Sequence, residues 1–241
     1  MLSLLGSATI AVMSIQENLD RVKARVKKAA SSFGRNLEEI KLIAVTKTIP
    51  FNLIEQAIQA GVTDIGENKV QEALPKIEAL KQKYPKVIWH MLGHLQRNKV
   101  RQALSAFDII QSLDSFRLAE EIQKKAEAKI IPVLIEVNTS GEESKFGVAL
   151  PEAARLVEEV SGLGNLCIQG LMTIGQLGPD PEAARLCFKR LKKLFDELKQ
   201  LNLPNVDLKY LSMGMSSDFE IAIEEGSNMV RVGQAFFGKR S

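Results

Sequence analysis

The sequence of 241 residues has few cysteines, few aromatic residues and little net charge, and each shortage excludes a class of protein. Its two cysteines, Cys167 and Cys187, have the spacing of neither a disulfide framework nor a metal motif, which indicates reduced thiols in a reducing compartment. The net charge is only +3, and the chain has just ten Phe, two Tyr and one Trp. Nucleic-acid binding requires a concentrated basic face with stacking aromatics, so we expect no nucleic-acid partner.

Long hydrophobic runs are also missing. Residues 1–13 (MLSLLGSATIAVM) are apolar, but they contain no Lys or Arg and are too short to span a bilayer. We expect this segment to be a disordered extension, with Met13 as an alternative start. Without a spanning or targeting segment, the sequence predicts a cytoplasmic protein with no membrane partner.

The rest of the chain alternates between short apolar runs and amphipathic helices. Strand-like runs without strict alternation of polar and apolar residues indicate strands that are buried on both faces, as in a parallel sheet. The runs lie at 40–45, 62–66, 87–92, 108–113, 131–137, 166–173, 208–212 and 229–232. The helices are expected at 14–33, 51–60, 69–82, 96–105, 115–128, 150–161, 180–201 and 218–225.

Eight strands, each followed or preceded by a helix, predict an α/β fold of the (β/α)8 TIM-barrel type with an extra N-terminal helix. An open, doubly wound sheet is the alternative, because periodicity does not prove closure. No GxGxxG follows the first strand, which disfavours a dinucleotide-binding version of that alternative. No linker or change of composition divides residues 14–241, so they are expected to form one domain.

Active sites of such barrels lie at the carboxyl ends of the strands. Lys47 follows the first strand, where partial burial would favour its neutral, nucleophilic amine and a Schiff base with an aldehyde. A solvated lysine is the alternative.

Two neighbouring loops near the end of the chain could bind a phosphate. Ser212 ends the seventh strand and Gly214 follows it, before a helix that Ser216, Ser217 or Asp218 could cap, and Gly233 follows the eighth strand. Paired loops after strands 7 and 8 are a frequent phosphate site in barrels, although ordinary helix capping explains the same residues.

Three other polar residues are candidate ligands. Arg231 lies inside the last strand, where it should face a ligand or an acid in a structural ion pair. His90 and His94 have the i,i+4 spacing of a zinc pair, but Met91 occupies the place of the glutamate in HExxH. We expect no metal, and His94 could still contact a ligand.

Several motifs together strongly resemble the pyridoxal phosphate homeostasis proteins, which are relatives of the N-terminal barrel of alanine racemase. They are VTKTIP (45–50), DIGENKVQEALPK (64–76), WHMLGHLQRNK (89–99), VNTSGEESKFG (137–147), LMTIG (171–175) and LSMGMSSDFEIAIEEGSNMVRVGQAFFG (211–238). The resemblance covers residues 14 to 238.

The resemblance implies that pyridoxal 5′-phosphate (PLP) is held on Lys47 as an internal aldimine. It also implies that Asn68 lies beside the pyridine ring and that Arg231 faces the pyridine nitrogen. Ser212 would bind the phosphate together with the turn at Gly233 and Gln234. The expected function is intracellular PLP and amino-acid homeostasis without catalytic turnover, with PLP-dependent enzymes as recipients.

An amino-acid racemase is the alternative function, and a Schiff-base aldolase without a cofactor is a more distant one. The racemase fold carries a second domain whose tyrosine acts as the second base, whereas this chain stops at Ser241 and has only Tyr84 and Tyr210. We therefore expect a monomeric carrier rather than an enzyme. The polar loop 139–147 is expected to be either a mobile solvated loop or a lid with Lys145 near the mouth.

Overall fold

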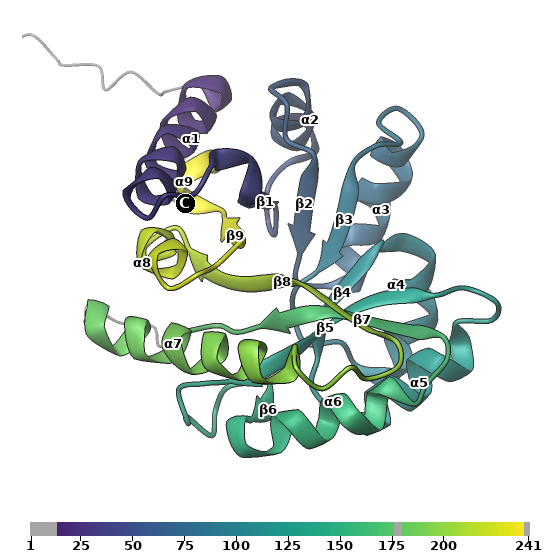
Figure 1. The fold of residues 1–241 in the computed structure, drawn as a ribbon. Helices are drawn as coiled ribbons and strands as arrows, with labels where there is room; N and C mark the ends of the chain where they lie inside the picture. The colour runs from purple at the N-terminus through teal and green to yellow at the C-terminus, as the bar shows by residue number, and fades with distance from the viewer. Residues whose placement is uncertain (1–13, 176–179, 239–241) are drawn as a thin grey trace, which may run out of the picture.

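The computed structural model describes residues 14–175 and 180–238, so the expectation for residues 1–13 lies outside the described residues. Parallel strands form the centre of the molecule (Figure 1). The strands are β1 (Lys41–Val45), β2 (Asp64–Glu67), β3 (Ile88–Met91), β4 (Ile109–Leu113), β5 (Ile131–Asn138), β6 (Val148–Ala149), β7 (Leu166–Met172), β8 (Val206–Met215) and β9 (Met229–Val232).

Strand pairing closes the sheet into a barrel. The order is β4-β3-β2-β1-β9-β8-β7-β5-β6, and β4 also pairs with β5, which joins the two sides. Ile43 of β1, for example, pairs with Asp64 of β2 and with Arg231 of β9. Only β6 lies outside the ring, as a short strand on β5. The predicted eight-stranded parallel barrel is therefore confirmed, and the open sheet is wrong.

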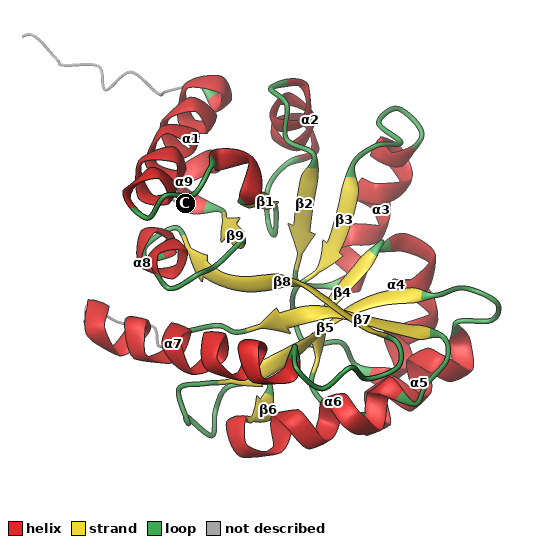
Figure 2. Cartoon of the chain, in the orientation of Figure 1, coloured by secondary structure: helices red, strands yellow, loops and turns green. Residues whose placement is uncertain are grey.

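Helices surround the barrel (Figure 2). They are α1 (Ile15–Ser32), α2 (Phe51–Gln59), α3 (Val70–Lys81), α4 (Val100–Ala106), α5 (Phe116–Lys125), α6 (Ala153–Ser161), α7 (Pro181–Leu198), α8 (Phe219–Glu224) and α9 (Gln234–Phe237). Short 3-10 helices lie at η1 (Leu37–Glu39), η2 (Arg97–Lys99) and η3 (Leu150–Glu152).

The extra helix α1 begins at a capping box and closes one side of the barrel. Ser14 Oγ accepts the Glu17 N–H while the Glu17 carboxylate accepts the Ser14 N–H, which satisfies two amides at the helix start. The helix packs beside α8 and α9 (Figure 1), where Asn18 donates to the carbonyl of Phe236 and Arg25 pairs with Glu220.

Most element boundaries agree with the sequence to within a few residues, and the larger differences lie near the mouth. Strand β8 extends to Met215 because Gly214 adopts φ +93°, a left-handed conformation that glycine tolerates and that lets the strand turn into α8. A Cβ there would lie 2.5 Å from Ala222 Cβ. The short helix α9 and strand β6 were not expected from periodicity, because both are too short to show any.

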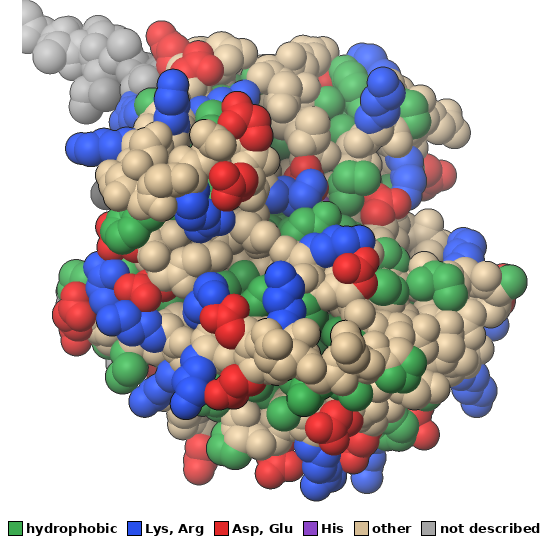
Figure 3. Space-filling model, viewed as in Figure 1, with side chains coloured by type: hydrophobic (Ala, Val, Ile, Leu, Met, Phe, Trp, Pro, Cys, Tyr) green, Lys and Arg blue, Asp and Glu red, His purple; other side chains and the backbone are tan. Residues whose placement is uncertain are grey.

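The apolar core has an outer and an inner part. The outer part lies between helices and strands, and a smaller cluster of Ile43, Leu92, Leu134, Met172 and Met229 fills the barrel interior. On the surface seen in Figure 3, acidic and basic side chains are interspersed. Among the described residues no helix has both the length and the apolar composition needed to cross a membrane.

Candidate functional site

A pocket of about 260 Å3 opens at the carboxyl ends of β1, β8 and β9. Its lining combines an amine, a guanidinium, hydroxyls and a glycine turn within one small volume. The lining residues are Val45, Lys47, Met215, Ser216, Ser217, Arg231, Gly233 and Gln234. The structure therefore brings together four of the predicted residues, Lys47, Arg231, Gly233 and Gln234, from strands that are distant in the sequence.

Lys47 lies in a tight turn directly after β1. The N–H of Ile49 donates to the carbonyl of Thr46 (3.0 Å), and Thr48 adopts φ +63° at the third position of the turn. A positive φ is unfavourable for a β-branched residue and costs about 1–3 kcal/mol, so the surrounding structure must hold the turn in place. The half-buried Lys47 side chain is thereby held at the pocket rather than in bulk water.

The turn is held from below by a buried ion pair. Glu67, at the end of β2, is fully buried, and its Oε1 accepts from Thr46 Oγ1 (2.6 Å) and Lys76 Nζ (2.7 Å). Lys76 also donates to the carbonyl of Thr46 (2.8 Å). Two of these bonds fix Thr46, the residue that precedes Lys47, and the third joins its two partners.

The other end of the pocket presents backbone amides. The N–H groups of Gly233 and Ala235 point at Ser216 Oγ, at 3.2 and 3.5 Å. Asp218 is the N-cap residue of α8, but its carboxylate accepts the N–H of Met215 (2.6 Å) and makes no bond within the helix. The sequence left Ser216, Ser217 and Asp218 open as caps of this helix. In the structure, the Ser216 hydroxyl accepts a hydrogen bond from the Gly233 turn.

Arg231 enters the pocket from the barrel interior. Only 5% of the residue is exposed, and its Nη1 and Nη2 donate to Ser212 Oγ and to the carbonyl of Thr173, both at 2.7 Å. Burial lowers the pKa of Arg231 to about 10, against the attraction of the Glu136 and Asp218 carboxyls. The side chain stays cationic at neutral pH, and no salt bridge within residues 14–175 and 180–238 includes it. The structural ion pair considered as its alternative role is not found there.

Two predicted residues lie elsewhere. Ser212 is fully buried beneath the pocket, where its hydroxyl accepts from Arg231 and donates to Gln111 Oε1 (2.7 Å). Asn68 follows β2 outside the residues that line the pocket, and its backbone packs against Gly93 so closely that a Cβ there would lie 2.2 Å from the Asn68 carbonyl oxygen.

Glu136 is a charged residue near this site that the sequence argument missed. It is 2% exposed on β5, and its Oε2 accepts no hydrogen bond from the described residues. Burial and the Asp114 carboxylate raise the pKa of Glu136 to about 7, against the attraction of Arg231. The available signal was a glutamate within the apolar run IPVLIEVN.

This shift predicts a pH dependence of stability. Because the pKa of Glu136 is about 7 in the folded protein and 4.5 in the reference state, folding favours the protonated carboxyl. The contribution of Glu136 to the free energy of unfolding is present in full below about pH 4.5. It is lost as the pH rises through 7, and the loss is at most about 3 kcal/mol. We expect Glu136→Gln to flatten urea-derived unfolding free energies over that range. Glu120→Gln, on an exposed part of α5, is the control, and an unchanged slope in Glu136→Gln would contradict the assignment.

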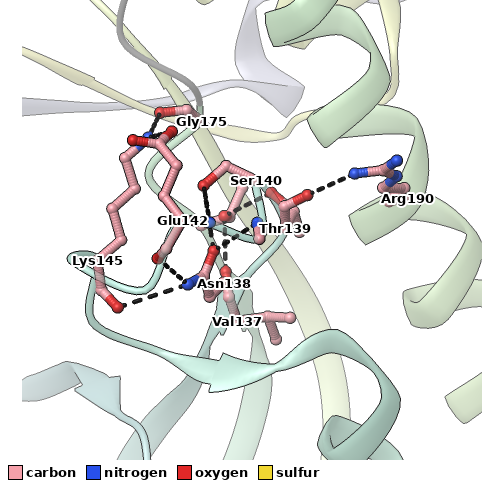
Figure 4. A network of polar contacts seen from close by, with 10 residues as sticks. Val137, Asn138, Thr139, Ser140, Glu142, Lys145, Gly175 and Arg190 are labelled. Atoms are coloured by element: carbon pink, nitrogen blue, oxygen red, sulfur yellow. Dashed lines mark hydrogen bonds and ion pairs between the residues drawn. The ribbon is translucent and has the colours of Figure 1, made fainter.

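Loop 139–147 is tied to the barrel (Figure 4). Asn138 Nδ2 donates to the carbonyl of Glu142 (2.8 Å), and Arg190 donates to the carbonyl of Thr139 (2.9 Å). Lys145 Nζ bonds Glu142 (2.6 Å) and the carbonyl of Gly175 (3.3 Å). These contacts favour an ordered loop over a purely solvated one, and a role as a lid stays a prediction.

The two histidines are separated in the structure. His90 is buried in the barrel, whereas His94 bonds Asp114 (3.1 Å) and stacks on Phe146 with the ring centres 4.2 Å apart. In the described part of the chain, no group of three or more His, Cys, Asp or Glu side chains is placed to hold a metal ion.

Comparison with known proteins first defines the class. The family model of the alanine racemase N-terminal domain matches residues 15–241. Alanine racemase of Clostridium difficile has the same fold, with a TM-score of 0.72 at 16% identity over 94% of this chain and 57% of that chain. Residues 15–241 of this chain therefore belong to the alanine racemase N-terminal domain class.

Closer relatives identify the family. The chain is 44% identical over 230 residues to the pyridoxal phosphate homeostasis protein of Aquifex aeolicus, covering 95% of this chain and 99% of that protein. It is 39% identical over 238 residues to the human protein of the same name, covering 92% and 85%. The chain belongs to the pyridoxal phosphate homeostasis protein family. Among solved structures, Synechococcus elongatus PipY with PLP bound has a TM-score of 0.81 and 33% identity, covering 93% of this chain and 100% of that one.

Proposed function

We propose that this protein binds PLP in the pocket at the carboxyl ends of β1, β8 and β9, here called the mouth pocket. It would hold PLP covalently through Lys47 and serve PLP homeostasis without catalytic turnover. The observation that carries the proposal is the convergence of Lys47, Ser216, Arg231 and the Gly233–Gln234 turn on one pocket from three strand ends. Membership in the pyridoxal phosphate homeostasis family supports the same ligand.

The donor set of the pocket fits PLP. When bound, PLP supplies an aldehyde that condenses with primary amines and a conjugated ring that serves as an electron sink. Lys47 would supply the amine, and the amides of Gly233 and Ala235 with the Ser216 hydroxyl would hold the phosphate. Ser212 would act behind Arg231 instead of on the phosphate, since its hydroxyl is engaged by Arg231 and Gln111. Asn68 does not line the pocket, and its place beside the ring rests on the family resemblance alone.

The position of Arg231 suits a carrier, which needs no carbanion, and a racemase tolerates it equally. A cation that faces the pyridine nitrogen disfavours protonation of that nitrogen, which weakens the electron sink. Both tyrosines of the chain also lie away from the pocket. Tyr84 bonds Glu55 (3.0 Å), and Tyr210 lines a hollow near Lys41 at the amino end of the barrel. Neither is placed to serve as a second base opposite Lys47.

The cellular setting is part of the same proposal. Cys167 and Cys187 are both free thiols, which supports a reducing, cytoplasmic compartment. PLP-dependent enzymes are the proposed recipients of the cofactor, and residues 14–241 are proposed to act as a single-domain monomer.

Absorbance and proton exchange separate the carrier from a racemase-like enzyme. The PLP-loaded protein is mixed with L- and D-amino acids in D2O while the visible spectrum and the α-hydrogen signal are recorded. A carrier keeps its band, or loses it as PLP leaves, and exchanges no α-hydrogen. New transient bands together with α-deuteration would establish turnover. A protein that gains no band when reconstituted with PLP would refute the binding proposal itself.

A further inference from the structure

One line of hydrogen bonds crosses the barrel interior from the mouth toward the opposite end. Arg231 Nη1 donates to Ser212 Oγ (2.7 Å), and Ser212 Oγ donates to Gln111 Oε1 (2.7 Å). Gln111 Nε2 lies 2.9 Å from His90 Nδ1, and His90 Nε2 lies 2.9 Å from Asp64 Oδ1. Five side chains from β9, β8, β4, β3 and β2 thus join the carboxyl end of the barrel to its amino end.

The two ends of this line and the orientation of the Gln111 amide determine its direction. A guanidinium only donates and a carboxylate only accepts, and Gln111 faces Ser212 with Oε1 and His90 with Nε2, so the hydrogens between them point from Arg231 toward Asp64. The Gln111 amide then donates to Nδ1 of His90, and the proton of the His90 ring is left on Nε2, where it faces Asp64. A second protonation of His90 would remove the acceptor that Gln111 uses.

The line is buried along its whole length. Asp64 is 3% exposed, His90, Gln111 and Ser212 are fully buried, and Arg231 is 5% exposed. Branched apolar side chains usually fill a barrel interior, and a buried polar network is unfavourable unless each member is satisfied. Aligned hydrogen bonds in a medium of low dielectric constant also polarise one another, so the carboxylate at one end affects the guanidinium at the other.

Other charges act at each end of the line. Glu136 and Asp218 interact with Arg231 electrostatically but do not touch it as salt-bridge partners in the described residues. At the amino end, Lys41 Nζ (3.1 Å) and Thr63 Oγ1 (2.7 Å) bond Asp64. Burial opposes ionisation of Asp64, but the bonds from His90 and Thr63 and the charge of Lys41 lower its pKa overall. Asp64 is therefore the anion on which the line ends.

We propose that Gln111 and His90 are positioning residues for Arg231. They hold its guanidinium in one orientation beneath the pocket and connect it to the Asp64 carboxylate at the far end of the barrel. The inference rests on the proposed function, in which Arg231 faces the bound cofactor. It adds that the Asp64 carboxylate, at the amino end of the barrel, influences the guanidinium of Arg231 and through it the cofactor bound at the mouth.

The first test needs no cofactor. Nitrogen-15 NMR of the histidine rings is recorded on PLP-free His94→Gln, in which His90 is the only histidine left. We expect the neutral form of the His90 ring to carry its proton on Nε2. In Gln111→Glu within the same background, the new side chain only accepts, so the His90 ring should become doubly protonated. A proton on Nδ1 of the neutral ring, or an unchanged ring in Gln111→Glu, would overturn the direction of the line.

The second test measures how the network affects the titration of PLP bound in the pocket. The pH midpoint of the visible absorbance change is compared for PLP-loaded wild type, Gln111→Leu, Asp64→Asn and Tyr210→Phe. Gln111→Leu leaves every charge in place but breaks the line, so we expect a shift of about half a pH unit or more, with a similar shift in Asp64→Asn. Tyr210→Phe, in the same interior, should match wild type.

An unchanged midpoint in Gln111→Leu and Asp64→Asn would refute the positioning role and leave a merely structural network. If either variant fails to fold, the NMR result on His94→Gln still decides the proton arrangement on which the inference depends. Failure of wild type to bind PLP would refute the proposed function while leaving that NMR result intact.

Discussion

Replacing Lys47 with alanine is expected to abolish covalent attachment of PLP and to leave weaker, reversible binding. Lys47 is the lysine that lines the mouth pocket, whereas Ser216, Arg231 and the Gly233 amide remain in the variant to hold the phosphate and ring. Borohydride reduction followed by intact-protein mass spectrometry measures the covalent fraction, and equilibrium dialysis measures the remainder.

Lys145→Ala is the matched control for this experiment. Lys145 is also a partly buried lysine at the same end of the barrel, but its amine bonds Glu142 and the carbonyl of Gly175. We expect its covalent labelling to match wild type. Equal labelling of wild type and Lys47→Ala, or loss of labelling only in Lys145→Ala, would show that another lysine carries PLP.

Lys76→Met is expected to destabilise the fold by about 3–5 kcal/mol, because it leaves the buried carboxylate of Glu67 without its cation. The same change removes the bond from Lys76 to the carbonyl of Thr46, so the strained turn at Thr48 loses a support. We therefore expect slower and weaker covalent labelling of Lys47, measured beside the unfolding free energy in urea.

Two variants separate this effect from a general loss of charge. Lys69→Met removes an exposed lysine whose pair with Glu72 lies on the surface, and should leave stability close to that of wild type. Adding Glu67→Gln to Lys76→Met removes the buried charge and should recover much of the loss. A Lys76→Met protein as stable as wild type would contradict the stabilising role of the Lys76–Glu67 pair.

Sequence periodicity predicted the strands well because buried parallel strands appear as uninterrupted apolar runs, and these runs dominate this chain. It failed where an element is too short to have a period, as in α9, or where one residue changes the conformation, as Gly214 does in β8. The strand ends also identified Lys47, Arg231 and Gly233, since the carboxyl ends of barrel strands meet at one mouth.

Polar residues inside strands were harder to place. His90, Gln111, Glu136 and Ser212 each lie in an apolar run, and the sequence shows only that such a residue is unusual there. Which of them touch depends on strand register and on the diameter of the closed barrel. A strand position determines the face to which a side chain points, but not its partner across the interior.

The sequence by itself therefore predicted a barrel-type α/β fold and placed Lys47 at the end of its first strand. The spacing of apolar runs and the residues that end them are local properties, and local properties are readable along the chain. Only the tertiary structure decided that Ser216 meets the Gly233 amides, that Ser212 lies behind Arg231, and that Asp64 is connected to the mouth. Those pairings join residues far apart in the chain, and closure of the barrel brings them within hydrogen-bonding distance.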